Sequence, residues 1–145
     1  MATAVQPVRL SVDVPLPPAE AFDLFTAGIT EWWPYKTHFT RGPVESLVFE
    51  TRLGGELKEV CADGVVVTYG EVLGWDPPRR VVIKWMAARR PVPPTEVEVR
   101  FSAIESGTRV DLEHRGFPAQ PERDSYAGGW PGVLAKFVAR ASITT

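Results

Sequence analysis

Two polar side chains, His114 and Glu71, fall where a strand pattern turns them toward an apolar interior. Along the segment 108–114, the side chains of Val110 and Leu112 share the parity of His114, so its imidazole should point with the apolar set. A neutral imidazole in such a place can hydrogen-bond a ligand carbonyl or hydroxyl, or act as a general base. The alternative is a histidine satisfied by a loop carbonyl at the rim of the interior.

A parity count along 65–75 places the carboxylate of Glu71 among inward-facing apolar side chains. An inward carboxylate is costly unless it is hydrogen-bonded or protonated. Glu71 therefore either meets a partner or leaves the interior through a β-bulge at Gly70 or Gly74. If both side chains do face inward, a pair of His114 and Glu71 would form a polar anchor in an aromatic pocket.

Aromatic side chains supply the rest of the candidate site, and the five tryptophans fall beside Gly and Pro residues that end predicted elements. Large rigid rings suit either a solid core or a pocket that takes flat, apolar ligands by stacking and burial. Trp33, Trp85 and Trp130 come from three segments that must meet, whereas Trp32 and Trp75 are expected at the rim or outside. The predicted ligand-binding residues are Trp33, Phe49, Tyr69, Glu71, Trp85, His114, Tyr126, Trp130 and Phe137.

No catalytic residue, cofactor or metal site is predicted, which favours a non-enzymatic protein. The chain has no Gly-x-Ser-x-Gly, phosphate loop or dinucleotide fingerprint. Its two histidines, His38 and His114, lack metal-ligand spacing. The single cysteine, Cys61, is expected to be a buried, inert thiol.

The chain as a whole indicates one domain over 1–145, because 145 residues can bury a core without disulfides or metals. A net charge of −2 gives no general attraction to nucleic acid or to anionic membranes. No basic leader is followed by an apolar run, and no stretch approaches the roughly 20 apolar residues of a membrane span. We therefore expect a cytoplasmic protein with neither nucleic acid nor membrane as a partner.

The elements that must position these residues follow from periodicity. Two short helices, one after Pro17 and one at Trp32-Trp33-Pro34, should follow the first strand, and Gly128-Gly129 and Pro131 predict a bend or a late start near Trp130 in a long C-terminal helix. Short, turn-rich links between the later strands favour antiparallel neighbours. The predicted strands are 8–14, 44–51, 55–61, 65–75, 80–86, 95–104 and 108–114. The sequence thus predicts an α+β helix-grip fold, in which a seven-stranded, curved antiparallel sheet wraps around the C-terminal helix.

Three stretches carry a resemblance to a known family: 21–26 (Ala21-Phe22-Asp23-Leu24-Phe25-Thr26) with Glu31-Trp32-Trp33-Pro34, 70–80 (from Gly70-Glu71-Val72 to Pro78-Arg79-Arg80), and 108–117 (from Thr108-Arg109-Val110 to Arg115-Gly116-Phe117). Together with Gly128-Gly129-Trp130 they resemble the SRPBCC (START/Bet v 1-like) superfamily, in the branch similar to the C-terminal domain of the activator of Hsp90 ATPase. The resemblance implies the helix-grip fold. It also implies a cavity between sheet and helix, which different members use for lipids, aromatic polyketides, hormones or chaperone contacts.

Three functions follow as hypotheses. The first is binding of a small apolar or aromatic molecule between the sheet and the C-terminal helix, by a monomer or a homodimer. The second is a chaperone-associated protein-interaction domain similar to the Hsp90 activator, and the third is a cyclase- or hydrolase-type enzyme. A closed pocket of roughly 300 Å³ or more would favour the first, and a filled core would favour an exposed interaction face.

Overall fold

The computed structural model describes residues 5–33, 44–61, 64–86 and 93–143. Its helices are α1 (Pro18–Phe25), the 3-10 turn η1 (Ile29–Glu31) and α2 (Gln120–Ala141). Its strands are β1 (Val8–Val14), β2 (Val44–Phe49), β3 (Glu56–Cys61), β4 (Val66–Asp76), β5 (Arg80–Trp85), β6 (Thr95–Ile104) and β7 (Gly107–Arg115).

The seven strands form one antiparallel sheet in the order β1-β7-β6-β5-β4-β3-β2. Strands β2 to β7 run as a meander, because their links are too short for parallel crossovers. The first strand closes the other edge by pairing with β7, from Val8 opposite His114 to Val14 opposite Thr108. This arrangement confirms the predicted fold class.

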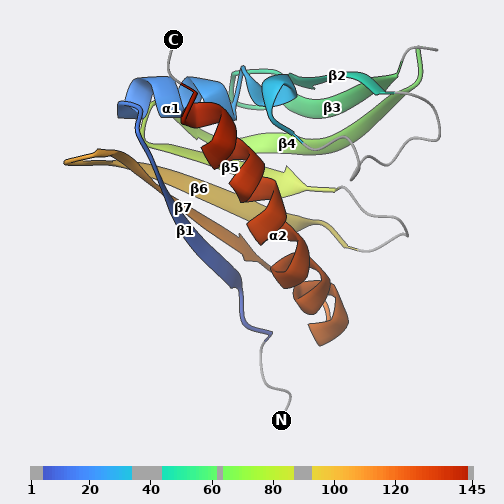
Figure 1. Cartoon of the computed structure of the whole chain (residues 1–145). Coiled ribbons are helices and arrows are strands. Elements are labelled where there is room, and N and C mark those ends of the chain that lie inside the picture. The colour runs from blue at the N-terminus through green and yellow to red at the C-terminus, as the bar shows by residue number, and fades with distance from the viewer. Residues whose placement is uncertain (1–4, 34–43, 62–63, 87–92, 144–145) are drawn as a thin grey trace.

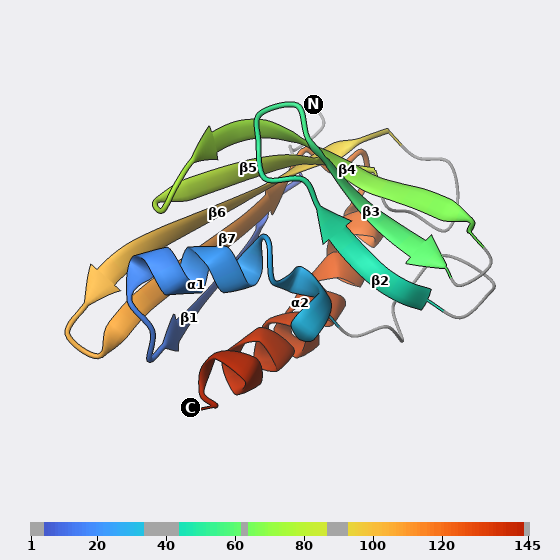
Figure 2. The ribbon, with the colours of Figure 1, turned by 90° about the horizontal axis from the view of Figure 1, so that it is seen from above.

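Helix α2 lies across the hollow face of the curled sheet, and α1 and η1 lie beside the C-terminal half of α2 (Figures 1 and 2). The side chains that α2 buries recur at steps of three and four, so they form one stripe toward the sheet. That stripe consists of Trp130, Val133, Leu134, Phe137 and Ala141. The interior of the protein is therefore the layer between this stripe and the inner face of the sheet.

Two expectations about the helices are wrong in position. Of the bend or late start expected near Trp130, the late start is wrong, since α2 begins at Gln120 and contains Pro131, and the bend stays a prediction. Gly128 and Gly129 are exposed, with no heavy atom within 4 Å of where a Cβ would stand, so they interrupt no packing. The second short helical turn is η1, which ends before Trp32, and Pro34, on which that expectation depended, lies outside the described residues.

Candidate functional site

The aromatic residues predicted from the sequence meet mainly in one group between β4, β5, β7 and α2. The ring of Trp33 lies 6.0 Å from that of Tyr69, 6.1 Å from Trp85 and 6.3 Å from Trp130, measured between centroids. Trp85 and Trp130 are 5.5 Å apart. These four side chains are at most 6% exposed, and most of the pairs are edge-to-face or tilted, as aromatic pairs prefer.

The other predicted aromatics lie in neighbouring clusters. Phe137 contacts Trp32 at 5.1 Å, and Phe49 lies 6.3 Å from Trp75 at the other end of the sheet. Trp32 was expected at the rim, but it is only 5% exposed, and its indole N–H donates to the Leu24 carbonyl at 2.9 Å. The short turn η1 carries Trp32 into the core beside Trp33, which the sequence alone did not predict.

His114 faces the interior, as its parity in β7 predicts, and is fully buried. The indole N–H of Trp130 donates to its Nδ1 at 3.0 Å. Since an indole only donates, Nδ1 carries no proton, and Nε2–H donates to the Thr95 hydroxyl at 2.6 Å. Burial lowers the pKa of His114 from 6.5 to about 3, so the imidazole stays neutral.

Both nitrogens of His114 are thus used by protein groups, and neither meets Glu71. The rim alternative was right that the histidine is satisfied within the protein, although side chains rather than a loop carbonyl satisfy it. A neutral ring with its one acceptor site filled by Trp130 cannot take a proton from a ligand in this arrangement. The geometry gives His114 a positioning role, in which it fixes the orientation of the Trp130 ring.

Glu71 leaves the interior at irregularities in β4. The register of β4 shifts against β3 between Leu57 and Lys58, and against β5 between Val72 and Gly74. As a result Val72 is 1% exposed, while Glu71 is half-buried opposite Lys84. The structure therefore does not bring Glu71 to the aromatic group, and the pairing with His114 is replaced by the escape through a bulge.

A different carboxyl group is buried there, that of Glu59 in β3. Glu59 is 0% exposed and accepts a hydrogen bond from the Tyr69 hydroxyl at 2.6 Å. Burial, followed by this contact with Glu59, raises the pKa of the Tyr69 hydroxyl above its usual value, so the phenol keeps its proton. The sequence analysis missed Glu59, although the alternation of Leu57, Glu59 and Cys61 places all three on one face.

Hydrogen bonds also join the aromatic side chains to one another. The indole N–H of Trp85 donates to the Tyr126 hydroxyl at 3.2 Å, and the Tyr126 ring lies 4.5 Å from that of His114. The indole N–H of Trp33 is buried without a hydrogen-bond partner. The aromatic group thus combines apolar ring surface with a few fixed polar atoms and the unused donor of Trp33.

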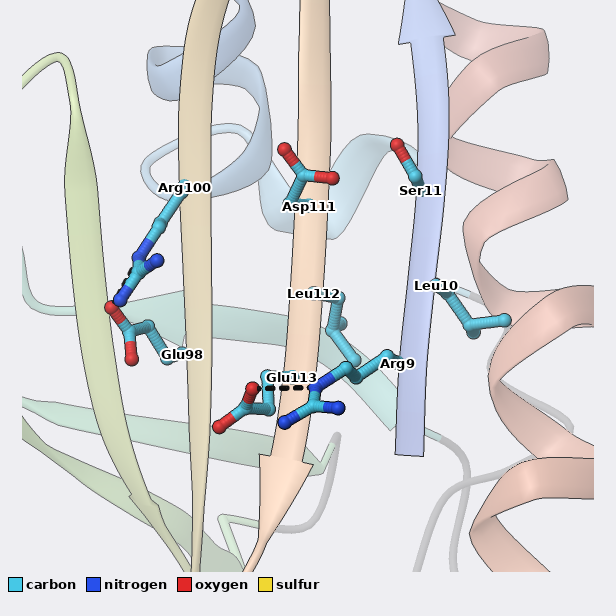
Figure 3. Close-up of a pocket in the computed structure, with 8 residues that line it drawn as sticks. All are labelled: Arg9, Leu10, Ser11, Glu98, Arg100, Asp111, Leu112 and Glu113. Atoms are coloured by element: carbon cyan, nitrogen blue, oxygen red, sulfur yellow. Dashed lines mark hydrogen bonds and ion pairs between the residues drawn. The ribbon is translucent and has the colours of Figure 1, made fainter. Parts of the chain in front are cut away.

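A hollow of about 360 Å³ lies on the opposite, outer face of the sheet (Figure 3). It is lined by charged side chains of β1, β6 and β7 that pair with each other, such as Arg9 with Glu113 at 3.0 Å. Beside it Glu98 accepts hydrogen bonds from three arginines; burial would raise the pKa of Glu98, but these contacts lower it to about 2. This ion-pair surface shares no side chain with the predicted aromatic site.

Two further features of the described ranges bear on function. No three or more His, Cys, Asp or Glu side chains there are grouped to hold a metal ion. No helix within these ranges is long and apolar enough to cross a membrane.

A curved antiparallel sheet that grips one long helix around an aromatic interior defines the helix-grip class, that of the SRPBCC proteins. Within it, the chain belongs to the family described as activator of Hsp90 ATPase homolog 1-like protein, whose family model matches residues 15–142. The resemblance seen in the sequence is therefore confirmed. A search of curated proteins gave no match.

Three solved structures illustrate the likeness. The Aha1 dimer from Colwellia psychrerythraea has a TM-score of 0.72 at 15% identity, with 94% of this chain and 96% of that chain covered. Protein MLL2253 from Mesorhizobium loti has a TM-score of 0.70 at 21% identity, with 92% and 95% covered. The anthrahydroquino-γ-pyrone synthase Txn09, solved in a complex, has a TM-score of 0.59 at 28% identity, with 96% and 99% covered.

Proposed function

We propose that the protein binds a small, flat, apolar or aromatic molecule between the inner face of its sheet and α2. The residues proposed to contact it are Trp33, its neighbours Tyr69, Trp85 and Trp130, and Tyr126, whose hydroxyl accepts a hydrogen bond from Trp85. Phe49 and Phe137, from the neighbouring clusters, are proposed as outer contacts. His114 supports the site by holding Trp130. Glu71 is not proposed as a ligand contact, because a bulge turns it away from the interior.

The observation that carries the proposal is the fully buried Glu59 carboxyl group, bonded to Tyr69 in the middle of aromatic surface. Burying a carboxyl group is unfavourable, and a core that served only for packing would be more stable with an apolar residue of similar size. Ligand sites, in contrast, combine apolar walls with a few fixed polar groups that orient the ligand. The pair formed by Glu59 and Tyr69 has this composition.

The comparisons support the same class of ligand. Txn09 is named as a synthase of an anthrahydroquino-γ-pyrone, which is an aromatic compound, and it covers nearly the whole of this chain. The rings described above already touch one another, so this part of the interior is filled, which by itself favours the exposed interaction face. Binding between the sheet and α2 therefore requires that a ligand move some of the rings apart. We expect Trp33 to move, since its indole N–H has no hydrogen bond to break, whereas that of Trp130 is held by His114.

The direct test is native mass spectrometry of protein purified from its own host, followed by a titration with flavonoids, fatty acids and sterols that is read by tryptophan fluorescence. A retained small molecule, or saturable binding of a panel member, would support the proposal. Absence of both would remove it.

Paired variants show where the ligand sits. Tyr69→Phe removes one interior hydroxyl and keeps the ring, so it should weaken binding by roughly five- to tenfold. Ser11→Lys changes the outer hollow and leaves the interior intact, so it should leave the affinity unchanged. The opposite pattern would place the ligand on the outer face and contradict the proposal.

Two other hypotheses stay predictions with their own readouts. A synthase is among the relatives of this fold, so the titration mixtures should also be analysed for a change in ligand mass, which would reveal turnover. The family description names an Hsp90 activator, so the ATPase rate of Hsp90 should be measured with and without the protein.

A further inference from the structure

We propose that the indole N–H of Trp33 selects the ligand, so that the interior prefers flat apolar molecules with a neutral ring carbonyl over the matching hydrocarbons. This inference rests on the proposed function and assigns a chemical class to its ligand. It starts from a donor in the aromatic group, the Nε1–H of Trp33, that no protein group in the described residues uses.

Trp33 differs in this respect from the other buried tryptophans. The indole N–H groups of Trp32, Trp85 and Trp130 each donate a hydrogen bond, over 2.9 to 3.2 Å. Trp33 is equally buried, at 6% exposure, but its Nε1 has no partner. Buried N–H groups are nearly always satisfied in folded proteins, because an unpaired donor has lost its water without gaining a replacement. An acceptor that arrives with a ligand would supply the missing bond.

The surroundings of this N–H are those of a binding site. The Trp33 ring lies among Tyr69, Trp85 and Trp130 at 6.0 to 6.3 Å, wider than the 5.1 Å contact between Trp32 and Phe137 in the adjacent core. A flat molecule enters this group only by parting these rings, which contact one another at ordinary aromatic distances. Stacking between them would place an edge atom of that molecule near the indole edge of Trp33.

Nearby polar atoms restrict which acceptor suits the donor. The Tyr69 hydroxyl donates a hydrogen bond to Glu59. Burial is the main reason for the raised pKa of this hydroxyl, and the nearby Trp33 indole opposes the rise in part. The Trp33 indole acts on that hydroxyl as a weak donor, but its geometry falls short of a hydrogen bond. An anionic acceptor would stand close to the buried Glu59 carboxyl group, which disfavours it. A neutral carbonyl accepts the bond without bringing a charge into the buried site.

The experiment compares fluorene with 9-fluorenone, which share one flat tricyclic shape and differ by a CH₂ replaced with a carbonyl. Equilibrium dialysis gives the affinity ratio of the two probes for the wild type, for Trp33→Phe and for the control Trp32→Phe. The ratio is compared between proteins, so the different solubilities of the probes cancel. Trp32→Phe makes the same change in an adjacent buried residue whose N–H is already bonded to Leu24.

We expect Trp33→Phe to reduce the preference for fluorenone by roughly five- to tenfold, with no change in Trp32→Phe. In the wild type, the indole proton resonance of Trp33, assigned by its loss in Trp33→Phe, should move downfield with fluorenone and not with fluorene. This NMR readout decides the question even if Trp33→Phe fails to fold.

Two results would overturn the inference, and they are distinguishable. If both probes bind but neither the ratio nor the Trp33 resonance responds to the carbonyl, the donor role is wrong and the proposed function stands. If the wild type binds neither probe and no member of the wider ligand panel, the proposed function fails and this inference fails with it.

Discussion

Acidification from pH 7.5 to 5.5 should lower the free energy of unfolding by about 1.4 kcal/mol through His114 alone. The imidazole is fully buried with both nitrogens hydrogen-bonded, and burial lowers its pKa from 6.5 to about 3. In the unfolded chain the same side chain regains its ordinary value of 6.5. Between these two values the unfolded state binds a proton that the folded state does not. The stability is therefore intact above pH 6.5 and declines as the pH falls toward 3.

The magnitude follows from the linkage between protonation and folding. Below pH 6.5, each further unit removes up to about 1.36 kcal/mol, and integration from 7.5 to 5.5 gives about 1.4 kcal/mol. Urea unfolding at the two pH values, followed by tryptophan fluorescence, measures the difference. The chain has only two histidines, so His38→Gln gives a background in which His114 is the sole imidazole. In that background, adding His114→Gln should remove the decline.

Two results would refute this reasoning. One is a decline of the same size in the single and the double variant, which would assign it to other groups. The other comes from the His38→Gln protein itself, without a substitution at His114. If its imidazole carbon resonances titrate near pH 6.5 while the protein is folded, the ring is not held neutral by its surroundings. This second measurement also covers the case in which the double variant does not fold.

Two further predictions concern stability away from the aromatic group. Glu98→Gln removes the charge that faces three arginines, so at pH 7 it should destabilise the protein by up to about 3 kcal/mol in urea unfolding. The pKa of Glu98 lies at about 2 instead of 4.5, so the difference in free energy of unfolding between wild type and variant should shrink as the pH falls from 4.5 toward 2. A difference that does not change with pH would mean that the variant is destabilised through packing. Gly128 is exposed to solvent in the middle of α2, and nothing lies within 4 Å of the methyl group that Gly128→Ala would add. Because alanine favours the helix more than glycine does, this substitution should raise the free energy of unfolding by about 0.5–1 kcal/mol. A thermal melt that shows destabilisation would mean that this face of α2 is covered in solution.

The sheet was predictable because its strands carry regular alternation. β1 and β6 have the predicted bounds, and in β7 the buried residues Val110, Leu112 and His114 follow the parity count. The same count is wrong in the second half of β4. A register shift turns Val72 inward there in place of Glu71, and alternation cannot reveal such a shift. Gly70 gives the local reason, since a Cβ at that position would lie 2.6 Å from the Lys84 carbonyl oxygen.

The candidate site was predictable in its aromatic part and not in its polar part. Tyr69, Trp85 and Trp130 meet because each lies on the inner side of its own element, which a pattern of apolar residues shows, and Trp33 follows closely after η1. Which hydrogen bonds they form depends on distances between elements far apart in the chain. No local pattern indicates that Trp130 faces Nδ1 of His114.

The hydrogen-bond partners reverse the roles that residue types alone suggest for this interior. Histidine is the usual first choice for proton transfer or ligand contact, yet His114 has both nitrogens occupied and remains neutral. Tryptophan is usually considered for its apolar area, yet Trp33 holds the free donor. A ligand can add a hydrogen bond only where the protein has left one unmade, because breaking an existing one costs about as much as the new one returns. Selectivity in this site should therefore depend on Trp33 and be largely insensitive to the protonation of His114.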